Sequence, residues 1–291
     1  MISQTAKIIE RGLRFMGMRN AVSKKMSAPK RDNRYEKPPK CFYDKYIVRC
    51  DTISDKPCVS LKTSANPRKH IFYFHGGAYT LQAQKMHWSI VDHILSEIPC
   101  EITFINYPLA PEFTCADTMT MVREAYSSLS EKNGQETILM GDSAGGGLAL
   151  ALAQYIQREG LQPKPKKLVL FSPWLDVSMA DDIPQEQAEK DLILAKETLI
   201  MVGKRYAGDH DTRDARCSPL YGDVTGIGDV ALFTGTSEIL HVQAVQLKNK
   251  LISKGQRLSW YEYEQMQHVW VGFPIPEAKE AMDQVIAFID K

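Results

Sequence analysis

One serine lies in a stretch, ETILMGDSAGGGLAL at 136–150, where an apolar run changes abruptly into a glycine-rich turn. Ser143 has Gly141 two residues before it and Gly145 two residues after it. A helix-favouring apolar run follows, so the pattern predicts a strand, a sharp turn and a helix. A serine at such a turn stands clear of the sheet, and the glycines let strand and helix approach closely. Ser143 is therefore a candidate nucleophile; a turn needed only for close packing is the alternative.

A nucleophilic serine needs hydrogen-bond donors for the negative charge that develops on the attacked oxygen. The sequence His75-Gly76-Gly77 directly follows a strand-like run, and adjacent glycines there leave backbone N–H groups free to face a ligand. Ala144 begins the helix after the serine, where N–H groups are unpaired and negative charge is favoured. We therefore expect Gly76, Gly77 and Ala144 to form an oxyanion hole. An ordinary Gly-Gly turn is the alternative.

The nucleophile also needs a base. Three histidines follow Ser143 in the chain, namely His210, His241 and His268. His268 comes just after the last strand-like run, at the sheet end where the serine emerges, so we expect it to be the base. His241 falls within an expected helix, and His210 precedes the expected acid.

The base in turn needs an acid that orients it, and on such a sheet the acid lies between serine and histidine in chain order. Glu238 follows the strand-like run DVALF directly, in the stretch TGTSEIL, and is the expected acid. Asp229 precedes that run and so lies at the wrong end of the strand. Asp209 and Asp214 belong to an insertion.

The elements that must position these residues follow from the spacing of apolar, β-branched and aromatic residues. Two strands come first, and strands and helices alternate afterwards, so we expect a mainly parallel sheet with helices on both faces and an antiparallel edge. The expected strands are 43–50, 58–62, 70–74, 101–106, 137–140, 167–171, 230–233 and 258–263. The expected helices are 85–97, 116–130, 144–159, 237–253 and 277–290.

Two regions lie outside this alternation. Residues 1–40 combine one amphipathic segment with a stretch rich in proline and lysine, and residues 176–215 form a long insertion. We expect a catalytic domain at 41–291 in which 176–215 is a cap insertion, and an N-terminal cap segment at 1–40. A peripheral helical layer without a role in binding is the alternative.

The charge pattern limits the classes of partner. The chain has 291 residues and a net charge of +1, so it does not resemble a nucleic-acid-binding protein. Residues 1–40 nevertheless hold eleven Lys or Arg and three Asp or Glu. We interpret this excess as a solvated helix face; an enzyme that docks on a membrane surface through this basic arm is the other interpretation.

Composition also bears on the compartment. The six cysteines are scattered without a CxxC pair or zinc spacing, which is typical of reduced thiols in a cytosolic protein. Charges interrupt the apolar residues near the N-terminus, so we expect no signal peptide. No run approaches the roughly 20 apolar residues that span a bilayer. A cytoplasmic protein with no metal, no cofactor and no stable membrane insertion is expected.

Six motifs in one order carry a resemblance to a known family. The chain resembles the hormone-sensitive-lipase-like esterases of the α/β-hydrolase superfamily, which share the His-Gly-Gly motif. That resemblance implies an eight-stranded α/β-hydrolase sheet with a helical cap built from the N-terminal region and an inserted segment. The motifs are HGGAY at 75–79, NYPLAPE at 106–112, GDSAGG at 141–146, SPWLD at 172–176, TSEIL at 236–240 and QHVW at 267–270.

The same resemblance implies roles for single residues. Ser143 would be the nucleophile, His268 the general base and acid, and Glu238 the acid that orients the histidine. The sequence departs from the family at three positions. The family often has Asp where Glu238 stands, and many members have Gly at Ala78 and Asn at Gly147. None of these changes removes a catalytic group.

The expected function is hydrolysis of small soluble esters with short acyl chains, through an acyl-enzyme. An amidase or deacetylase acting on small aryl or acylated substrates is an alternative, and so is a non-catalytic relative that binds small ligands. A small-molecule ester is the expected partner, nucleic acid is not, and a homodimer is left open. Asp142 is expected to make a structural hydrogen bond. Four aromatic residues either line a pocket or belong to the core: Tyr79, Trp88, Trp174 and Trp270.

Overall fold

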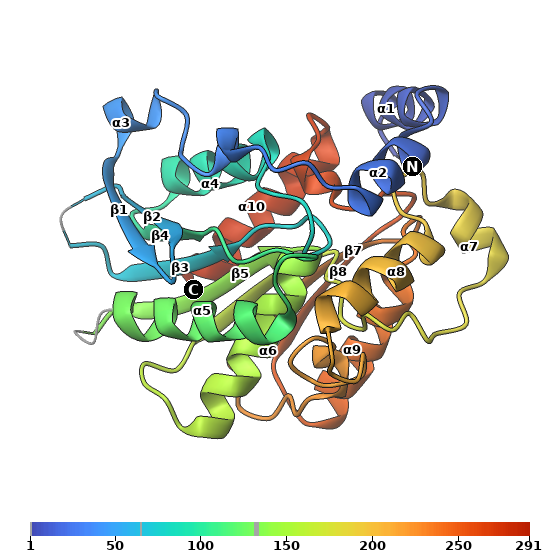
Figure 1. The fold of residues 1–291 in the computed structure, drawn as a ribbon. Helices are drawn as coiled ribbons and strands as arrows, with labels where there is room; N and C mark the ends of the chain where they lie inside the picture. Colours follow the sequence, from blue (N-terminus) through green and yellow to red (C-terminus); the bar gives the residue numbers. More distant parts are fainter. Residues whose placement is uncertain (1, 65, 131–133) are drawn as a thin grey trace.

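An eight-stranded sheet forms the centre of the computed structural model, which describes residues 2–64, 66–130 and 134–291 (Figure 1). The strand order is β1-β2-β4-β3-β5-β6-β7-β8. Strand β2 pairs antiparallel with β1 and β4, and the pairs from β4 through β8 are parallel. The expected α/β-hydrolase sheet with its antiparallel edge is confirmed. The strands are β1 (Ile47–Ile53), β2 (Lys56–Lys62), β3 (Lys69–Phe74), β4 (Glu101–Ile105), β5 (Glu136–Asp142), β6 (Lys167–Phe171), β7 (Asp229–Gly235) and β8 (Leu258–Tyr263).

Ten α-helices occur in the described part of the chain, and those in the alternating region cover both faces of the sheet (Figure 1). Helices α5, α6 and α9 pack on one face, and α4 and α10 on the other, each over its own apolar cluster. The helices are α1 (Gln4–Phe15), α2 (Met18–Ser27), α3 (Phe42–Lys45), α4 (Lys85–Glu97), α5 (Cys115–Leu129), α6 (Ala144–Glu159), α7 (Gln185–Lys190), α8 (Lys196–Ala207), α9 (His241–Ser253) and α10 (Pro276–Asp290).

The central strands are buried on both sides because helices cover both faces. In β5 every residue from Thr137 onward is buried, and β6 is buried throughout. Such strands show continuous apolar runs instead of alternation, which is why the sequence marks them clearly. The helix expected at 237–253 begins only at His241, because residues 236–240 form a turn.

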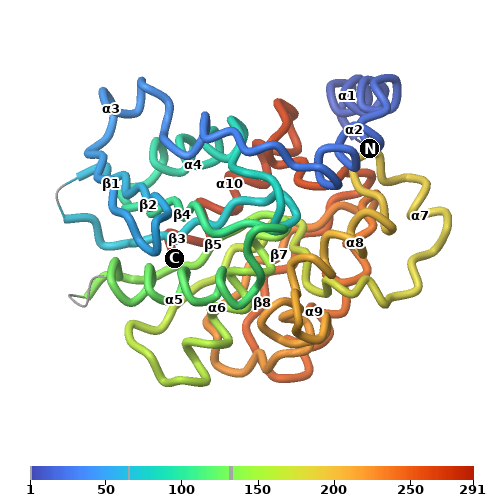
Figure 2. The backbone as a smooth tube through the Cα atoms, viewed as in Figure 1, coloured from blue at the N-terminus to red at the C-terminus, as the bar shows by residue number. Residues whose placement is uncertain are grey.

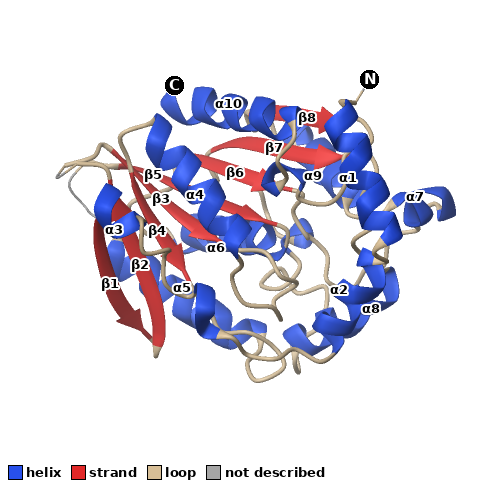
Figure 3. Cartoon of the chain, turned by 90° about the horizontal axis from the view of Figure 1, so that it is seen from above, coloured by secondary structure: helices blue, strands red, loops and turns tan. Residues whose placement is uncertain are grey.

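The two regions outside the alternation lie next to each other. Helix α2 from the N-terminal region packs beside α8 from the insertion (Figure 3). The Arg205 guanidinium donates to the carbonyl oxygen of Ser27 at 2.8 Å. Figure 2 shows the N-terminal segment and the segment around α7 on the same side of the molecule. Within the described ranges, no helix is both long enough and apolar enough to span a bilayer.

Helix α6 approaches the sheet so closely that two glycines are required. A Cβ atom on Gly145 would lie 1.9 Å from the carbonyl oxygen of Phe74 in β3. A Cβ atom on Gly141 would lie 2.3 Å from the carbonyl oxygen of Gly145. Both distances are far below van der Waals contact, and both obstacles are backbone atoms. The helix start is therefore fixed against the ends of β3 and β5 by the absence of side chains.

Substitution of Gly145 tests this close approach. We expect Gly145→Ala to lower the free energy of unfolding by about 2 kcal/mol or more, because backbone atoms of β3 must move. Gly12→Ala is a matched control: Gly12 lies in α1 with no atom within 4 Å of the added Cβ, so the change should stabilise by about 0.5–1 kcal/mol. Urea unfolding measures both. Equal stability of the two variants would contradict the close approach.

Candidate active site

Ser143 occupies a backbone conformation that non-glycine residues rarely adopt. It joins β5 to α6 with φ 54° and ψ −122°. Such a conformation costs on the order of 1–3 kcal/mol and persists only where the surroundings impose it. Its N–H donates to the Phe171 carbonyl at 2.8 Å, and its carbonyl accepts the Trp174 N–H at 2.9 Å. The end of β6 and the loop that follows it thus hold the serine in the sharp turn that the sequence predicts.

The structure brings the three expected catalytic side chains into one hydrogen-bonded series. The distance from Ser143 Oγ to His268 Nε2 is 2.8 Å, and that from His268 Nδ1 to Glu238 Oε2 is 2.6 Å. All three side chains are buried, with Ser143 7% exposed and Glu238 fully enclosed. Glu238 Oε1 accepts hydrogen bonds from the Thr234 hydroxyl and the Gly235 N–H, each at 2.9 Å. The acid is therefore fixed by its own strand end.

Nearby carboxylates control the protonation of His268. Burial lowers the pKa of its imidazole, but the hydrogen bond to Glu238 and the negative charges of Glu238, Asp191 and Asp142 outweigh that effect. The pKa of His268 is therefore raised above its ordinary value. The Nδ1 proton is held by Glu238, so Nε2 faces Ser143 as the acceptor in the neutral ring.

Asp142 makes the structural hydrogen bonds that were expected of it. The buried carboxylate accepts hydrogen bonds from the Tyr73 hydroxyl at 2.7 Å and the Gly76 N–H at 3.0 Å, and His87 Nε2 lies 3.5 Å away. Burial raises the pKa of Asp142, but His87 and Tyr73 outweigh it and the net shift is downward. A charged carboxylate thus connects the end of β5 to the loop that begins at His75.

That contact corrects the expectation for Gly76. Its N–H already donates to Asp142, so Gly76 does not fit the role of an oxyanion donor. The next two N–H groups, of Gly77 and Ala78, have no acceptor within the described residues, and neither has the N–H of Ala144. Gly77 has φ +126°, a value open to glycine, and Ala78 has φ 54°. The donor pair in this loop is thereby displaced by one residue relative to the sequence expectation.

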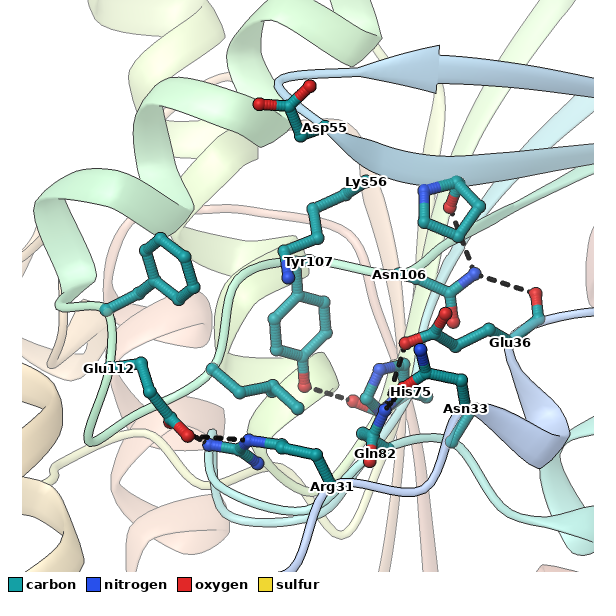
Figure 4. A pocket seen from close by; sticks show the side chains of 14 residues that line it. Arg31, Asn33, Glu36, Asp55, Lys56, His75, Gln82, Asn106, Tyr107 and Glu112 are labelled. Atoms are coloured by element: carbon teal, nitrogen blue, oxygen red, sulfur yellow. Dashed lines mark hydrogen bonds and ion pairs between the residues drawn. The ribbon is translucent and has the colours of Figure 1, made fainter.

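A polar cavity of about 290 Å³ is lined in part by His75, at the start of this loop (Figure 4), and Ser143 is not one of its lining residues. Its wall includes His75 and Tyr107, and the Tyr107 hydroxyl donates to the His75 carbonyl at 2.5 Å. Burial lowers the pKa of His75 to about 4, so its ring is neutral and Nδ1–H donates to the Gly76 carbonyl at 2.7 Å. Arg31 closes one side through its ion pair with Glu112. The hydrogen bonds of His75 and Tyr107 stabilise the loop that begins at His75.

The four aromatic residues near the motifs are all packed in the core. Tyr79, Trp88, Trp174 and Trp270 are at most 1% exposed. The Trp88 indole N–H donates to a backbone carbonyl at 2.8 Å, and that of Trp174 does so at 3.0 Å. Tyr79 stacks on Tyr206 of α8 with ring centroids 3.7 Å apart. Packing is therefore the role that the structure shows for them.

Two residues at the site were not found by sequence reasoning. Thr234 donates to Glu238, and the buried Asp191 lies in the insertion yet contributes charge at His268. The side-chain position of Thr234 could be inferred only once the turn after β7 was known. Nothing in the local sequence around Asp191 indicates a contact with a histidine 77 residues away.

Comparison with known proteins relates this chain to α/β-hydrolases. A family model described as alpha/beta hydrolase fold matches residues 71–272. An acetyl-hydrolase from Streptomyces hygroscopicus is 26% identical over 262 residues, which cover 88% of this chain and 87% of the relative.

Known structures agree with this match. EstE5, in crystals soaked with p-nitrophenyl butyrate, has a TM-score of 0.84 at 25% identity and covers 99% of this chain and 98% of its own. EstE7, a hormone-sensitive-lipase homologue from a metagenome library, shares the fold with a TM-score of 0.79 at 21% identity, over 100% and 99% of the two chains. The expected membership of the α/β-hydrolases is confirmed: the chain belongs to the α/β-hydrolase-fold family.

Proposed function

We propose that this chain is a serine carboxylic-ester hydrolase that acts on small soluble esters with short acyl chains. The observation that carries the proposal is the buried series from Ser143 Oγ through His268 to Glu238, with distances of 2.8 and 2.6 Å. A serine, a base and an orienting acid in this geometry are the requirements for acyl transfer. Similarity to proteins named acetyl-hydrolase and esterase supports an ester bond as the target.

In the proposed reaction, His268 Nε2 removes the proton from Ser143 Oγ as the oxygen attacks the ester carbonyl. The C–O bond to the alcohol breaks, and His268 gives its proton to the leaving alcohol. Water then repeats the cycle on the acyl-enzyme and releases the acid. Glu238 stays ionised, keeps the histidine in the required tautomer and stabilises its positive form.

The oxyanion donors in the proposed mechanism are the N–H groups of Gly77, Ala78 and Ala144, which are free for a substrate oxygen. Each such donor contributes about 3 kcal/mol of transition-state stabilisation in enzymes of this type. Ala144 adds the N-terminal end of α6, where the helix dipole favours negative charge. Gly76 acts indirectly, by holding the loop against Asp142.

The substrate class rests on weaker support than the reaction. EstE5 was soaked with p-nitrophenyl butyrate, an ester with a short acyl chain, and one relative is named acetyl-hydrolase. Amide hydrolysis on small aryl or acylated substrates uses the same groups and is the second candidate for the reaction.

A series of p-nitrophenyl esters from acetate to dodecanoate tests reaction and substrate together. We expect kcat/KM to be highest from acetate to butyrate and to fall with longer chains. Ser143→Ala should lower kcat by a factor on the order of 10⁶, because the nucleophile is lost. A maximum at long chains would overturn the substrate class alone. Hydrolysis of matched anilides but of no ester would favour the amidase, and ester hydrolysis that survives in Ser143→Ala would overturn the mechanism.

The pH dependence of kcat/KM follows from the raised pKa of His268. The base must be neutral, so activity is present above the pKa of His268 and is lost as pH falls through it. Because that pKa is raised, the loss should occur at a higher pH than the value of about 6.5 for a free imidazole. Glu238→Gln removes the main group that raises this pKa, so the acid limb should move to lower pH. The maximal rate should fall by about 10³–10⁴ because the tautomer is no longer fixed. An acid limb at the same pH in both proteins would contradict this assignment.

A further inference from the structure

A short piece of the insertion, residues 187–194, contacts the backbone around the catalytic acid; we call it the clamp segment. The Gln187 side-chain amide donates to the carbonyl oxygen of Glu238 at 2.7 Å. Asp191 Oδ2 accepts the N–H of Ile239 at 2.8 Å. The carbonyl and the N–H of the single peptide group that joins Glu238 to Ile239 are therefore both bound by side chains from one segment about 50 residues earlier in the chain.

The clamp segment also holds the loop of the base. Gln267, the residue before His268, accepts the N–H of Leu192 at 2.8 Å and donates to the carbonyl of Lys190 at 3.0 Å. Gln267 is 6% exposed, so water competes little for these bonds. One segment thus bonds to the chain beside the acid and beside the base.

Asp191 is the buried charge at the centre of the clamp segment. Its side chain is fully enclosed. Oδ1 accepts the N–H groups of Ile193 and Leu194, each at 2.8 Å, and Oδ2 accepts that of Ile239. The first two bonds are local and belong to an ordinary turn, whereas the third crosses to the residue next to Glu238. A buried carboxylate without a hydrogen-bonded cationic side chain is costly, and local turn formation alone does not require it.

The charge of Asp191 acts on His268. Burial raises the pKa of Asp191, while attraction to His268 and the three N–H donors oppose that effect. The same attraction acts on the imidazole together with the charges of Glu238 and Asp142. On the other side, Arg19 of α2 donates to the Asp191 carbonyl oxygen and, at 2.8 Å, to that of Ala188. The N-terminal arm therefore stabilises the backbone of the clamp segment.

We propose that Asp191 is a positioning residue for the catalytic pair: it fixes the backbone that carries Glu238 and places a second negative charge beside His268. That charge stabilises the imidazolium which forms when Ser143 loses its proton. The role in turnover rests on the proposed serine mechanism, whereas the charge effect on His268 does not.

Asp191→Asn separates this role from simple packing. The amide keeps the size of the side chain and one acceptor oxygen for the local turn, but its NH₂ group cannot accept the Ile239 N–H, and the charge is gone. We expect the pKa of His268 to fall by about half a unit to one unit. The kcat should fall about tenfold, with KM changed little, because the transition state loses charge stabilisation.

Asp214→Asn is the matched control. Asp214 belongs to the same insertion and also accepts a backbone N–H, that of Arg216, at 2.9 Å, but it is not among the charges that raise the pKa of His268. The Asp214→Asn variant should leave both the pKa of His268 and the kcat at their wild-type values.

Two measurements keep the outcome independent of folding and of the reaction. The His268 pKa is read by NMR titration in the Ser143→Ala background, with the signal assigned by its loss in His268→Gln. The kcat is expressed per serine that a fluorophosphonate probe labels, so that unfolded molecules are not counted. Asp191→Glu keeps the charge and should keep the pKa of His268 while lowering kcat; it serves as the test if Asp191→Asn does not fold.

The results then separate the two proposals. A His268 pKa in Asp191→Asn equal to that of Asp214→Asn would overturn the role of Asp191, and so would a lowered pKa in Asp191→Glu. Wild-type protein without ester turnover or probe labelling would overturn the proposed function. The NMR titration would still decide whether the negative charge of Asp191 raises the pKa of His268.

Discussion

The left-handed turn at Ser143 is the constraint on which the rest of the site depends. The backbone of Ser143, with φ 54° and ψ −122°, is bound by the last residue of β6, Phe171, and by Trp174 just beyond it. Helix α6 starts directly after the serine and against β3, where a Cβ on Gly145 would overlap the Phe74 carbonyl. The same approach presents the Ala144 N–H beside the serine. Strand packing, helix placement and the orientation of the Ser143 side chain are therefore one geometric condition.

Buried carboxylates are the second feature that shapes the site. Glu238, Asp142 and Asp191 are all enclosed, and each receives hydrogen bonds from backbone N–H groups or hydroxyls. Those donors offset part of the cost of removing a carboxylate from water. The remaining negative potential acts on His268, whose pKa it raises. A histidine placed among carboxylates in this way is a better proton acceptor, at the expense of activity at low pH.

The sequence predicts those features of the structure that depend on local residue patterns. It does not predict features that depend on contacts between residues far apart in the chain. The continuous apolar runs of β5 and β6 and the glycine spacing around Ser143 are local, so the sheet and the serine turn could be predicted. Chain order identified His268 and Glu238 because the strand ends meet at one edge. Gly76 was assigned wrongly because its N–H partner, Asp142, is 66 residues away. Asp191 escaped notice for the same reason.

The contacts of the clamp segment bear on when the surroundings of Glu238 and His268 become ordered. Since residues 187–194 bond to the peptide group after Glu238 and to the Gln267 side chain beside His268, this part of the insertion belongs to the ordered surroundings of both residues before any substrate arrives. The entropy of ordering these groups is then lost on folding and not on binding, which is how preorganised sites lower a barrier.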